Sequence, residues 1–560
     1  MDPMGRALLI LALNGFIASA LILMFRKSRI LAELFTVLSS FISLVSSLYL
    51  IINVSSAVRV DLLPHITLMA DKLSLFFSLV VSLIGTAVSI YSIDYMREAE
   101  DHARYYSLIS LFIGAMLNLV LASDLIYLLL NWELVGVCSA LLIGYWWERK
   151  EARRAGMKAL VMTRIGDIGL MAFTAIAIYY GASDIPSMLS SSSLISKLLP
   201  IAPLLILAAM GKSAQFPLHT WLPDAMEGPT TVSALLHAAT MVKAGIYLVL
   251  RFYPLLSLSS ESIIFLLAVS LVTLYISSLA GLVSNDIKRV LAFSTLSSLS
   301  LMFLAISIGQ FYVAILYLFN HALFKALLFL VAGKIEHTLH TRDITKLKNL
   351  WGKGFRFETL AFLVGALSAA GLPPLAAGIV KEEIFAGMSS YFTPTLYYII
   401  SGTLSFLLSI FIMRPFVLSF LGSSTRNEER NERTPLIFSV NLFLLFMTLL
   451  AYIPTSLLAS YFEGMKMEMS IELIPFSGVL LGIICAFLIP KVAIGPEESL
   501  RRFVESSFGM DILYNRIGEI FHYNLSTLAS KLNRGKASQG LLGLVVVILL
   551  FIILTLVVSP

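Results

Sequence analysis

Ionisable side chains inside apolar segments of membrane-spanning length are the feature that most constrains this chain. Five of them are lysines or arginines set among leucine, alanine and glycine, namely Arg164, Lys212, Lys243, Lys325 and Lys381. An ionised side chain at the centre of a bilayer costs about 2.5–3.5 kcal/mol even on the lenient insertion scale, so such residues generally mark a functional site. Apolar segments also hold Glu133, Asp167, His237 and His321. We therefore expect a buried polar path that moves an ion, and a proton in particular, through a membrane.

Composition places the rest of the chain in a bilayer as well. Of its 560 residues 58% are hydrophobic and only 13% are charged, whereas soluble domains have about 45–50% apolar and about 25% charged residues. Apolar runs of roughly 20 residues, each able to cross about 30 Å as a helix, recur near residues 16, 41, 83, 113, 134, 168, 207, 241, 272, 298, 321, 373, 409, 447, 480 and 549. Helices satisfy their own backbone polar groups in lipid, so we expect an all-α polytopic membrane protein with about 16 transmembrane helices.

The basic residues predict how these helices are oriented. Lys and Arg cluster in alternate loops, as at 149–158, 288–289, 342–356 and 491–502, and are sparse in the loops between them. Basic loops stay on the cytoplasmic side of a membrane, which predicts a multi-pass plasma-membrane protein with both termini on the outer side. The net charge of +6 reflects this sidedness. We therefore expect lipid and neighbouring membrane proteins as partners, and no nucleic acid.

Two segments share one design, a helix broken by proline or glycine close to a lysine. Pro217 and Pro223 interrupt the apolar run that carries Lys212, and the stretch 371–374 interrupts the run that leads to Lys381. Interrupted segments at corresponding places in two halves are typical of inverted-repeat transporters, although incidental proline kinks are the alternative. The breaks lie five spans apart, an odd number, which predicts two inverted five-helix repeats.

We expect six regions along the chain. They are helices 1–3 in 1–98, a first antiporter-like repeat of helices 4–8 in 99–256, a second inverted repeat of helices 9–13 in 257–422, helices 14–15 in 423–492, a lateral amphipathic helix in 493–538, and a final transmembrane helix in 539–560. The lateral helix is predicted from apolar residues at helical spacing with interleaved charge, such as Phe503, Phe508 and Ile512. This pattern is typical of helices that lie along a membrane surface or along neighbouring proteins.

Five motifs within residues 70–420 are specific enough to be compared with known families. They read NWELVGVCSALLIGYW, KALVMTRIGDIGL, GKSAQFPLHTWLPDAMEGPTTVSALLHAATMV, SNDIKRVLAFSTLSSLSLMFLA and HALFKALLFLVAGKIEH. With these motifs the chain resembles the large antiporter-like subunit of respiratory complex I (NADH–quinone oxidoreductase chain 5, or subunit L), which is related to multi-subunit Na+/H+ antiporters. The resemblance implies a proton-translocating subunit of a redox-driven translocase, with no redox centre of its own.

Three features depart from the family pattern. Tyr317 stands where the family often has a second histidine, four residues before His321, and Lys243 stands where bacterial members usually have a non-ionisable residue. The region between the last two spans is shorter than in the family, so the lateral helix would be truncated. These departures suggest an archaeal or divergent complex, fed by NADH or by another donor.

In the first half we expect a carboxylate and an amine to act as a pair. The resemblance places Glu133 beside Lys212 across two helices, where each would change the charge state of the other; the alternative is a static ion pair that fixes helix packing. Arg164 and Asp167 are spaced i, i+3 and share a helix face. They either neutralise each other or modulate the Glu133–Lys212 pair.

Five residues are expected to form the central part of the path, namely His237, Lys243, Tyr317, His321 and Lys325. The last three follow i, i+4, i+8 and form one stripe on a helix, an arrangement suited to a proton relay through water. An intact helix would not point His237 and Lys243 in the same direction. Either both serve consecutive points of a path, or one of them only packs.

By resemblance Lys381 is the lysine on the exit side and Glu382 its modulator; the alternative is an interfacial helix end with snorkelling side chains. Further polar residues, His219, Asp224 and Glu227, follow the first break on the basic side. They either receive protons or cap helix ends.

Cofactors are expected only in partner subunits. Cys138 and Cys485 lie apart in two spans and cannot build an iron–sulfur cluster or a zinc site. Quinone, flavin and iron–sulfur clusters would belong to partners, which include neighbouring antiporter-like subunits and a quinone-reducing module. Moving a charge against 100 mV requires about 2.3 kcal/mol, which such a module would supply. The alternatives are a subunit of a multi-subunit Na+/H+ antiporter or of a membrane-bound hydrogenase, a scaffold with an inactive channel, and a stand-alone solute carrier.

Overall fold

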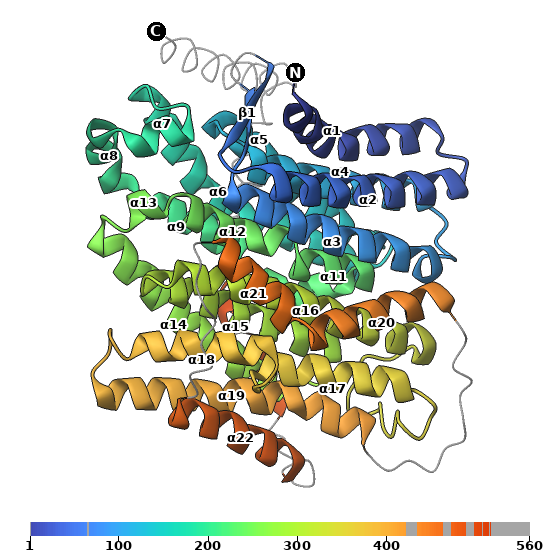
Figure 1. The fold of residues 1–560 in the computed structure, drawn as a ribbon. Coiled ribbons are helices and arrows are strands. Elements are labelled where there is room, and N and C mark those ends of the chain that lie inside the picture. The colour runs from blue at the N-terminus through green and yellow to red at the C-terminus, as the bar shows by residue number, and fades with distance from the viewer. Residues whose placement is uncertain are drawn as a thin grey trace, which may run out of the picture.

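Long helices that run roughly parallel to one another dominate the computed structural model (Figure 1). It describes residues 2–63, 66–421, 434–462, 472–488, 498–506, 508–514 and 516. Among these residues, 11 helices are long and apolar enough to cross a membrane, or up to 13 spans if each of two bent helix pairs is counted as one. The polytopic helical fold is therefore confirmed, whereas the number of sixteen spans stays a prediction.

The N-terminal part consists of helices and a β-hairpin. Its elements are α1 (Pro3–Met24), α2 (Arg29–Asn53), β1 (Val58–Leu63), β2 (Ile66–Ala70) and α3 (Lys72–Tyr95). The strands are antiparallel, with Val58 opposite Ala70. The hairpin corrects the all-α expectation, because side chains along β1 alternate between half-buried and exposed, with Val60 inward and Asp61 outward. This alternation is short and lies between two apolar spans, so the sequence did not predict the hairpin.

The ranges predicted for the two repeats, 99–256 and 257–422, hold the middle helices of the chain. The first contains α4 (His102–Leu121), α5 (Leu125–Ile143), α6 (Lys150–Tyr179), α7 (Ile185–Ser190), α8 (Ser192–Leu198), η1 (Leu199–Ile201), α9 (Pro203–Lys212), α10 (Trp221–Asp224), η2 (Ala225–Glu227), α11 (Thr230–Ala238), α12 (Met241–Arg251) and α13 (Tyr253–Leu256). The second contains α14 (Ser260–Val283), α15 (Ile287–Ser307), α16 (Phe311–Leu339), α17 (Arg356–Ala370), α18 (Ala376–Met388) and α19 (Pro394–Phe420). Their inverted relationship stays a prediction.

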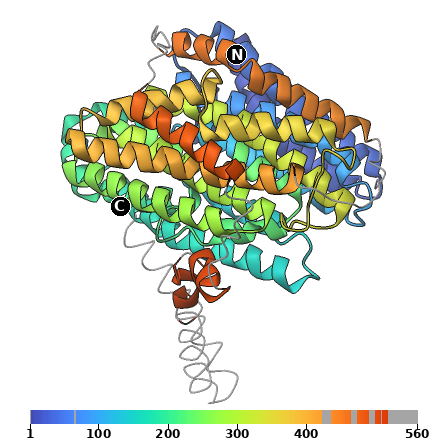
Figure 2. The same cartoon turned by 90° about the horizontal axis from the view of Figure 1, so that it is seen from below.

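The last described elements are α20 (Pro435–Leu449), α21 (Tyr452–Tyr461), α22 (Leu473–Leu488) and α23 (Glu498–Glu505). In Figure 1, α20 and α21 lie across the bundle between α3 and α17, and α22 packs along α19. In Figure 2 the red α23 lies on one side of the bundle, and it packs against α14. Most of the predicted lateral helix and all of the final predicted span, 539–560, lie outside the described residues.

Aspartates start many of the helices. Asp71, Asp101, Asp124, Asp184 and Asp286 each accept a hydrogen bond from a backbone N–H of the following first turn. Such caps satisfy donors that the helix itself leaves free. Four of these caps lie at the ends of spans and fix where an apolar segment begins, whereas Asp184 caps the short α7.

Several of the described spans are broken, including the bent pair α20–α21, and the sequence predicted two of the breaks. Helix α9 ends at Lys212, and prolines follow in the loop before α11. Helix α17 ends at Gly371, which has a left-handed backbone (φ 88°), and α18 starts after two prolines. A further break, at Ala239 and Thr240, separates α11 from α12. It has neither glycine nor proline, the residues from which a break is usually predicted.

Three spans form the interior of the bundle. One is the α11–α12 segment, and the other two are α15 and α16. The apolar stretch of each is entirely buried. Helix α11 packs against α16, and α16 packs against α15. These spans carry four of the ionisable residues singled out in the sequence, namely His237, Lys243, His321 and Lys325.

Candidate functional site

Lys212 ends the first half-helix inside a fully buried polar cluster. Its Nζ lies 3.3 Å from Oδ2 of Asp167, and neither side chain is exposed. The indole Nε1 of Trp132 donates to the other oxygen, Oδ1, over 2.6 Å. The Lys212 amine also lies 5.5 Å from the centre of the Trp132 ring. A buried charge is tolerated only when it is paired and hydrogen-bonded, and Asp167 meets both conditions.

The direct partner of Lys212 differs from the expected one. Glu133 forms an ion pair with Arg164, and not with Lys212. Arg164 Nη1 lies 3.8 Å from Oδ2 of Asp167, so the predicted i, i+3 contact on α6 is confirmed. The four groups thus alternate in charge from Glu133 through Arg164 and Asp167 to Lys212. The expected Glu133–Lys212 contact is absent between these two described residues, because Arg164 and Asp167 of α6 are their direct ion-pair partners.

This chain of charges extends from the interior to an apolar surface. The side chain of Glu133 is 20% exposed and that of Arg164 is 33% exposed, whereas Asp167 and Lys212 are fully buried. Large apolar side chains such as Leu130 and Ile168 are exposed on the same two helices. A charged pair within an apolar surface is costly in lipid, so this face is suited to contact another protein.

The break in the α11–α12 span places His237 and Lys243 on different half-helices. His237 lies within electrostatic range of Lys325 and Lys288. Lys243 donates from Nζ to the carbonyl oxygen of Leu318 over 3.0 Å. Both residues point toward α16, which an intact helix with this spacing would not allow.

The predicted stripe of Tyr317, His321 and Lys325 lies on α16 and is buried. Lys325 contacts the hydroxyl of Ser294 and donates to the carbonyl of Leu291, both on α15. His321 lies within electrostatic range of Lys243 and Lys325. The ring nitrogens of both histidines of the path, His237 and His321, are buried and have no hydrogen-bond partner among the described residues. Buried polar groups are normally satisfied by protein or by ordered water, so these rings are suited to bind water.

Lys381 lies beside the second break. Its Nζ donates to the carbonyl oxygen of Ala370, the last residue of α17, over 2.7 Å. The adjacent Glu382 is also buried, at 1% exposure, and its Oε2 has no hydrogen-bond partner among the described residues. Both side chains are thus inside the bundle, which disfavours the alternative of snorkelling at an interfacial helix end.

A small cavity lies among α15, α16, α17 and α19. It has a volume of about 10 Å3 and is lined by Ser294, Ser298, Tyr317 and Ala369, among others. A void of this size is close to what one water molecule requires. Ser294 contacts Lys325, and Ala369 precedes the residue that accepts the hydrogen bond of Lys381. The cavity therefore lies between the two lysines.

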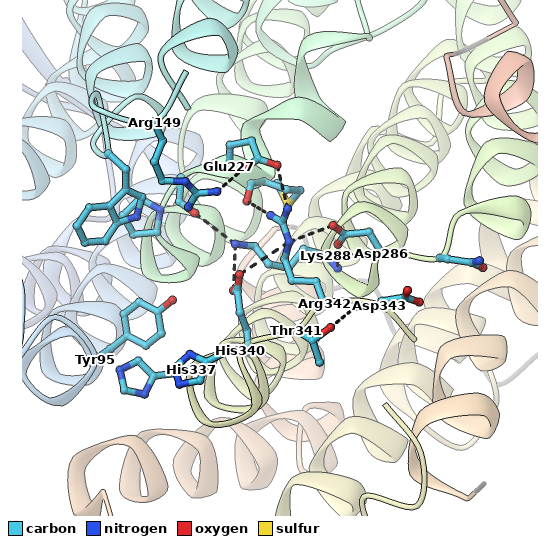
Figure 3. A pocket seen from close by; sticks show the side chains of 16 residues that line it. Tyr95, Arg149, Glu227, Asp286, Lys288, His337, His340, Thr341, Arg342 and Asp343 are labelled. Carbon is cyan, nitrogen blue, oxygen red and sulfur yellow. Dashed lines mark hydrogen bonds and ion pairs between the residues drawn. The ribbon is translucent and has the colours of Figure 1, made fainter. Parts of the chain in front are cut away.

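A larger cavity opens at the face of the basic loops (Figure 3). Its volume is about 710 Å3, and the polar residues around it include Tyr95, Arg149, Glu227, Asp286, Lys288, Glu336, His337 and Arg342. Lys288 Nζ lies 3.2 Å from Oε2 of Glu336, and that same oxygen accepts from the hydroxyl of Thr230 over 2.8 Å. Thr230 begins α11, two helical turns before His237. The cavity thus leads from the surface toward the central path.

Ion pairs hold the walls of this cavity. Arg342 contacts Glu227 at 2.9 Å and Asp286 at 3.1 Å, and Arg149 contacts Glu227 at 3.1 Å. Burial raises the pKa of Asp286 above its ordinary value, more than the nearby cations Arg342 and Lys288 lower it. In the sequence, these basic residues indicate only the orientation of the chain in the membrane. Their pairing with acids from distant loops, which builds the cavity, had no local signal.

The loop after the first break is anchored by the same kind of contact. Asp224 contacts Lys158 and Arg289, each at 2.6 Å. His219 is buried, and its Nδ1 lies 3.2 Å from the carbonyl oxygen of Pro217. Asp224 therefore connects α10 to α6 and α15, whereas Glu227 lines the cavity. Further residues that the sequence did not single out, Trp132 and Ser294, act as hydrogen-bond partners of the path residues.

Comparison with known proteins identifies the family. Residues 122–408 match the family described as NADH:quinone oxidoreductase/Mrp antiporter, TM, and residues 60–106 match NADH-Ubiquinone oxidoreductase (complex I), chain 5 N-terminus. The chain is 37% identical over 437 residues to NADH-ubiquinone oxidoreductase chain 5 of Allomyces macrogynus, covering 74% of this chain and 68% of that protein. It is 36% identical over 424 residues to F(420)H(2) dehydrogenase subunit L of Methanosarcina mazei, covering 68% of this chain and 62% of that one.

A solved structure supports the fold. A chain in the structure of the Mrp complex from Dietzia sp. DQ12-45-1b superposes with a TM-score of 0.77 at 24% identity, over 99% of this chain and 63% of that chain. The family match covers more than half of the sequence, and it includes both predicted breaks and every path residue. The chain belongs to the NADH:quinone oxidoreductase/Mrp antiporter family of membrane proteins.

Proposed function

We propose that this chain is the proton-translocating, antiporter-like membrane subunit of a complex I-like oxidoreductase that transfers electrons from NADH or another donor to quinone. The observation that carries the proposal is the line of buried ionisable residues along α11, α12 and α16, between the basic-loop cavity and the second broken helix. Relatives named NADH-ubiquinone oxidoreductase chain 5 and F(420)H(2) dehydrogenase subunit L match 74% and 68% of this chain. The proposal therefore includes both NADH and F(420)H(2) as electron donors.

In the proposed path, a proton enters the cavity at the basic loops and reaches His237 past Thr230. It then passes to Lys325, and the Ser294-lined cavity carries it on to Lys381. Each buried lysine can exchange a proton because burial disfavours the charged amine. The His321 ring lies beside Lys325 on α16 and completes the relay in the middle of the bundle.

The cluster at Lys212 would couple this path to the rest of the complex. Glu133 and Arg164 lie on an apolar face that is suited to a neighbouring membrane subunit. A change of charge at that face reaches Lys212 through Asp167, because the four groups alternate in charge. Asp167, Arg164, Tyr317 and Glu382 thus modulate the charge states of the lysines and histidines. The energy would come from a quinone-reducing module, since each charge moved against 100 mV requires about 2.3 kcal/mol.

The proposal also covers location and cofactors. The chain would lie in the plasma membrane with its basic loops in the cytoplasm, as the distribution of Lys and Arg predicts. Flavin, iron–sulfur clusters and quinone would be bound by partner subunits, and this chain would hold no redox centre.

A second candidate function is that of a subunit of a multi-subunit Na+/H+ antiporter, which the similarity in fold to a chain of an Mrp complex favours. Purification of the chain from its native membrane with its bound partners separates the two. Quinone-reducing and iron–sulfur subunits in the purified complex, with donor-driven proton uptake into vesicles that does not need sodium, support the complex I-like assignment. Copurification of membrane subunits alone, with sodium-dependent proton exchange, contradicts it.

A further inference from the structure

A second cavity lies on the face opposite the basic loops, where α2 ends and α3 and α16 begin. Its volume is about 340 Å3, and its lining includes Ser55, Asp71, Leu250 and Ile315. Ser55 and its neighbours 56 and 57 are exposed, so the cavity opens to the surface. It is distinct from the second broken helix and its Lys381, which do not line it.

The bottom of this cavity lies close to the amine of Lys243. Ile315 on α16 lines the cavity, and Leu318, whose carbonyl accepts the hydrogen bond of Lys243, follows three residues deeper. Three residues of α-helix rise about 4.5 Å. On α12, Leu250 lines the cavity and lies seven residues beyond Lys243, on the same helix face. The hydrogen-bond partner of Lys243 thus lies about one turn beneath the cavity on α16, and Lys243 itself lies about two turns beneath it on α12.

A polar column on α12 marks the same direction. Lys243, Tyr247 and Arg251 are spaced i, i+4, i+8 and share one face. Arg251 Nε donates to the hydroxyl of Tyr247 over 3.1 Å, and its two terminal nitrogens contact both oxygens of Asp71 at 2.5 and 2.9 Å. Asp71 neutralises the guanidinium of Arg251, so the positive charge in the cavity lining is that of the neighbouring Lys72.

We infer that this cavity gives the Lys243 amine its own water access to the face opposite the basic loops, as an outlet separate from that of Lys381. The inference rests on the proposed function for its direction of transport. A proton leaves the Lys243 ammonium for water in the cavity, which leaves a neutral amine and a hydrated proton. His321, which lies within electrostatic range of Lys243, then supplies the next proton. The path therefore branches at the middle of α16, toward Lys381 and toward Asp71.

Aqueous thiol labelling of the assembled complex tests the outlet. In a complex with Cys138→Ala and Cys485→Ala, single cysteines are placed at Ile315, at Leu318, at the exposed Ser55 as positive control, and at Leu328 as dry control. Leu328 lies on the same helix as Ile315 and packs against Gly365. The probe is a membrane-impermeant, positively charged methanethiosulfonate, applied from each face of sealed vesicles.

We expect Ile315→Cys to react from the face opposite the basic loops about tenfold faster than Leu328→Cys, because only a hydrated thiol ionises readily. Labelling at Ile315→Cys should also lower the number of protons pumped per electron pair and leave electron transfer unchanged. Reaction no faster than at Leu328→Cys, reaction only from the basic-loop face, or unchanged pumping after labelling overturns the outlet. If the complex with Leu318→Cys does not assemble, the labelling rate of Ile315→Cys alone tests the outlet.

The same preparations separate this inference from the proposed function. If Lys212→Ala abolishes pumping while Ile315→Cys stays unreactive, the proposed function holds and the outlet is wrong. If Ile315→Cys reacts from the expected face but donor-driven pumping is absent in the unlabelled complex, the water access holds and the proposed function fails.

Discussion

Asp167 is the counter-ion of Lys212, with 3.3 Å between Oδ2 and Nζ and no exposure of either side chain. This contact places the first-half lysine under the control of α6 and makes Glu133 an indirect partner. The ends of the cluster differ in environment, since Lys212 is enclosed while Glu133 and Arg164 lie at an apolar surface. A signal from a neighbouring subunit therefore has to pass through Asp167.

Replacing Asp167 with asparagine should disable this relay. Asn keeps the shape but leaves Lys212 as a buried cation without its counter-ion, and removal of one partner of a buried pair costs about 3–5 kcal/mol. We expect the lysine to become neutral and proton pumping to fall at least as far as in Lys212→Ala. Pumping is measured as protons per electron pair in reconstituted vesicles. Asp61→Asn, at an exposed position of β1, is the control, and equal pumping in both variants would contradict the role of Asp167.

Glycine at position 371 should be required for the position of Lys381. A methyl group there would collide with the Lys381 side chain, and the backbone is left-handed (φ 88°). Gly354 has a similar backbone (φ 93°) with open space around it, so Gly354→Ala carries the strain, about 1–2 kcal/mol, without the collision. We expect Gly371→Ala to lower pumping and Gly354→Ala to lower only the thermal midpoint. The same loss of pumping in both variants would show that strain, and not the lysine, is responsible.

The Asp71–Arg251 ion pair should make stability depend on pH. Burial by itself raises the pKa of Asp71, but the charge and hydrogen bonds of Arg251, with those of Ser74, lower it from 3.8 to about 2. A lowered folded-state pKa adds stability that is fully present above pH 3.8 and is lost as the pH falls through about 2. One pKa unit corresponds to about 1.4 kcal/mol, so the contribution is about 2 kcal/mol. Denaturant unfolding of wild type and Asp71→Asn should differ by this amount at pH 6.

The sign of this dependence is open to a direct check. The difference between wild type and Asp71→Asn should stay constant from pH 6 to about pH 4 and narrow as the pH approaches 2. A difference that grows on acidification would contradict the assignment of Arg251 as the partner of Asp71.

Glu336→Gln should slow proton entry at the basic-loop cavity. Glutamine retains the hydrogen bond with Thr230 but leaves the buried Lys288 without its anion. Hydrogen bonds to charged groups contribute about 1.5–3 kcal/mol, so we expect a lower thermal midpoint and slower pumping at unchanged electron transfer. Glu151→Gln, at an exposed position of the same face, serves as control. Wild-type pumping rates in Glu336→Gln would place the entry elsewhere.

The sequence predicted the membrane class, the two proline and glycine breaks and the stripe on α16, because each depends on local composition or spacing. It did not predict the partner of Lys212, since α5, α6 and α9 bring four charges together and only their packing decides which oxygen meets which nitrogen. The break at Thr240 also escaped, because neither glycine nor proline marks it. The cavity behind Lys288 and Arg342 depends on loops more than a hundred residues apart and had no signal in the chain.

Short elements explain why two of the predicted spans, near residues 373 and 480, are not counted, whereas the predicted span near residue 549 lies outside the described residues. Helix α22 has 16 residues and α17 has 15, so neither alone meets the length of a full span, although hydropathy counted both regions. The β-hairpin at 58–70 was not predicted, because its alternating pattern is short and lies beside apolar runs of membrane-spanning length.

Lys325 is the residue on which the account depends most, because it lies between His237, His321 and the cavity toward Lys381. The most direct measurement is the ratio of protons pumped to electrons transferred in reconstituted complex carrying Lys325→Ala, compared with Lys346→Ala, whose side chain is 73% exposed. The account predicts that Lys325→Ala lowers this ratio while quinone reduction continues, and that Lys346→Ala leaves it unchanged. An unaltered ratio in Lys325→Ala would contradict a proton path through the centre of the bundle.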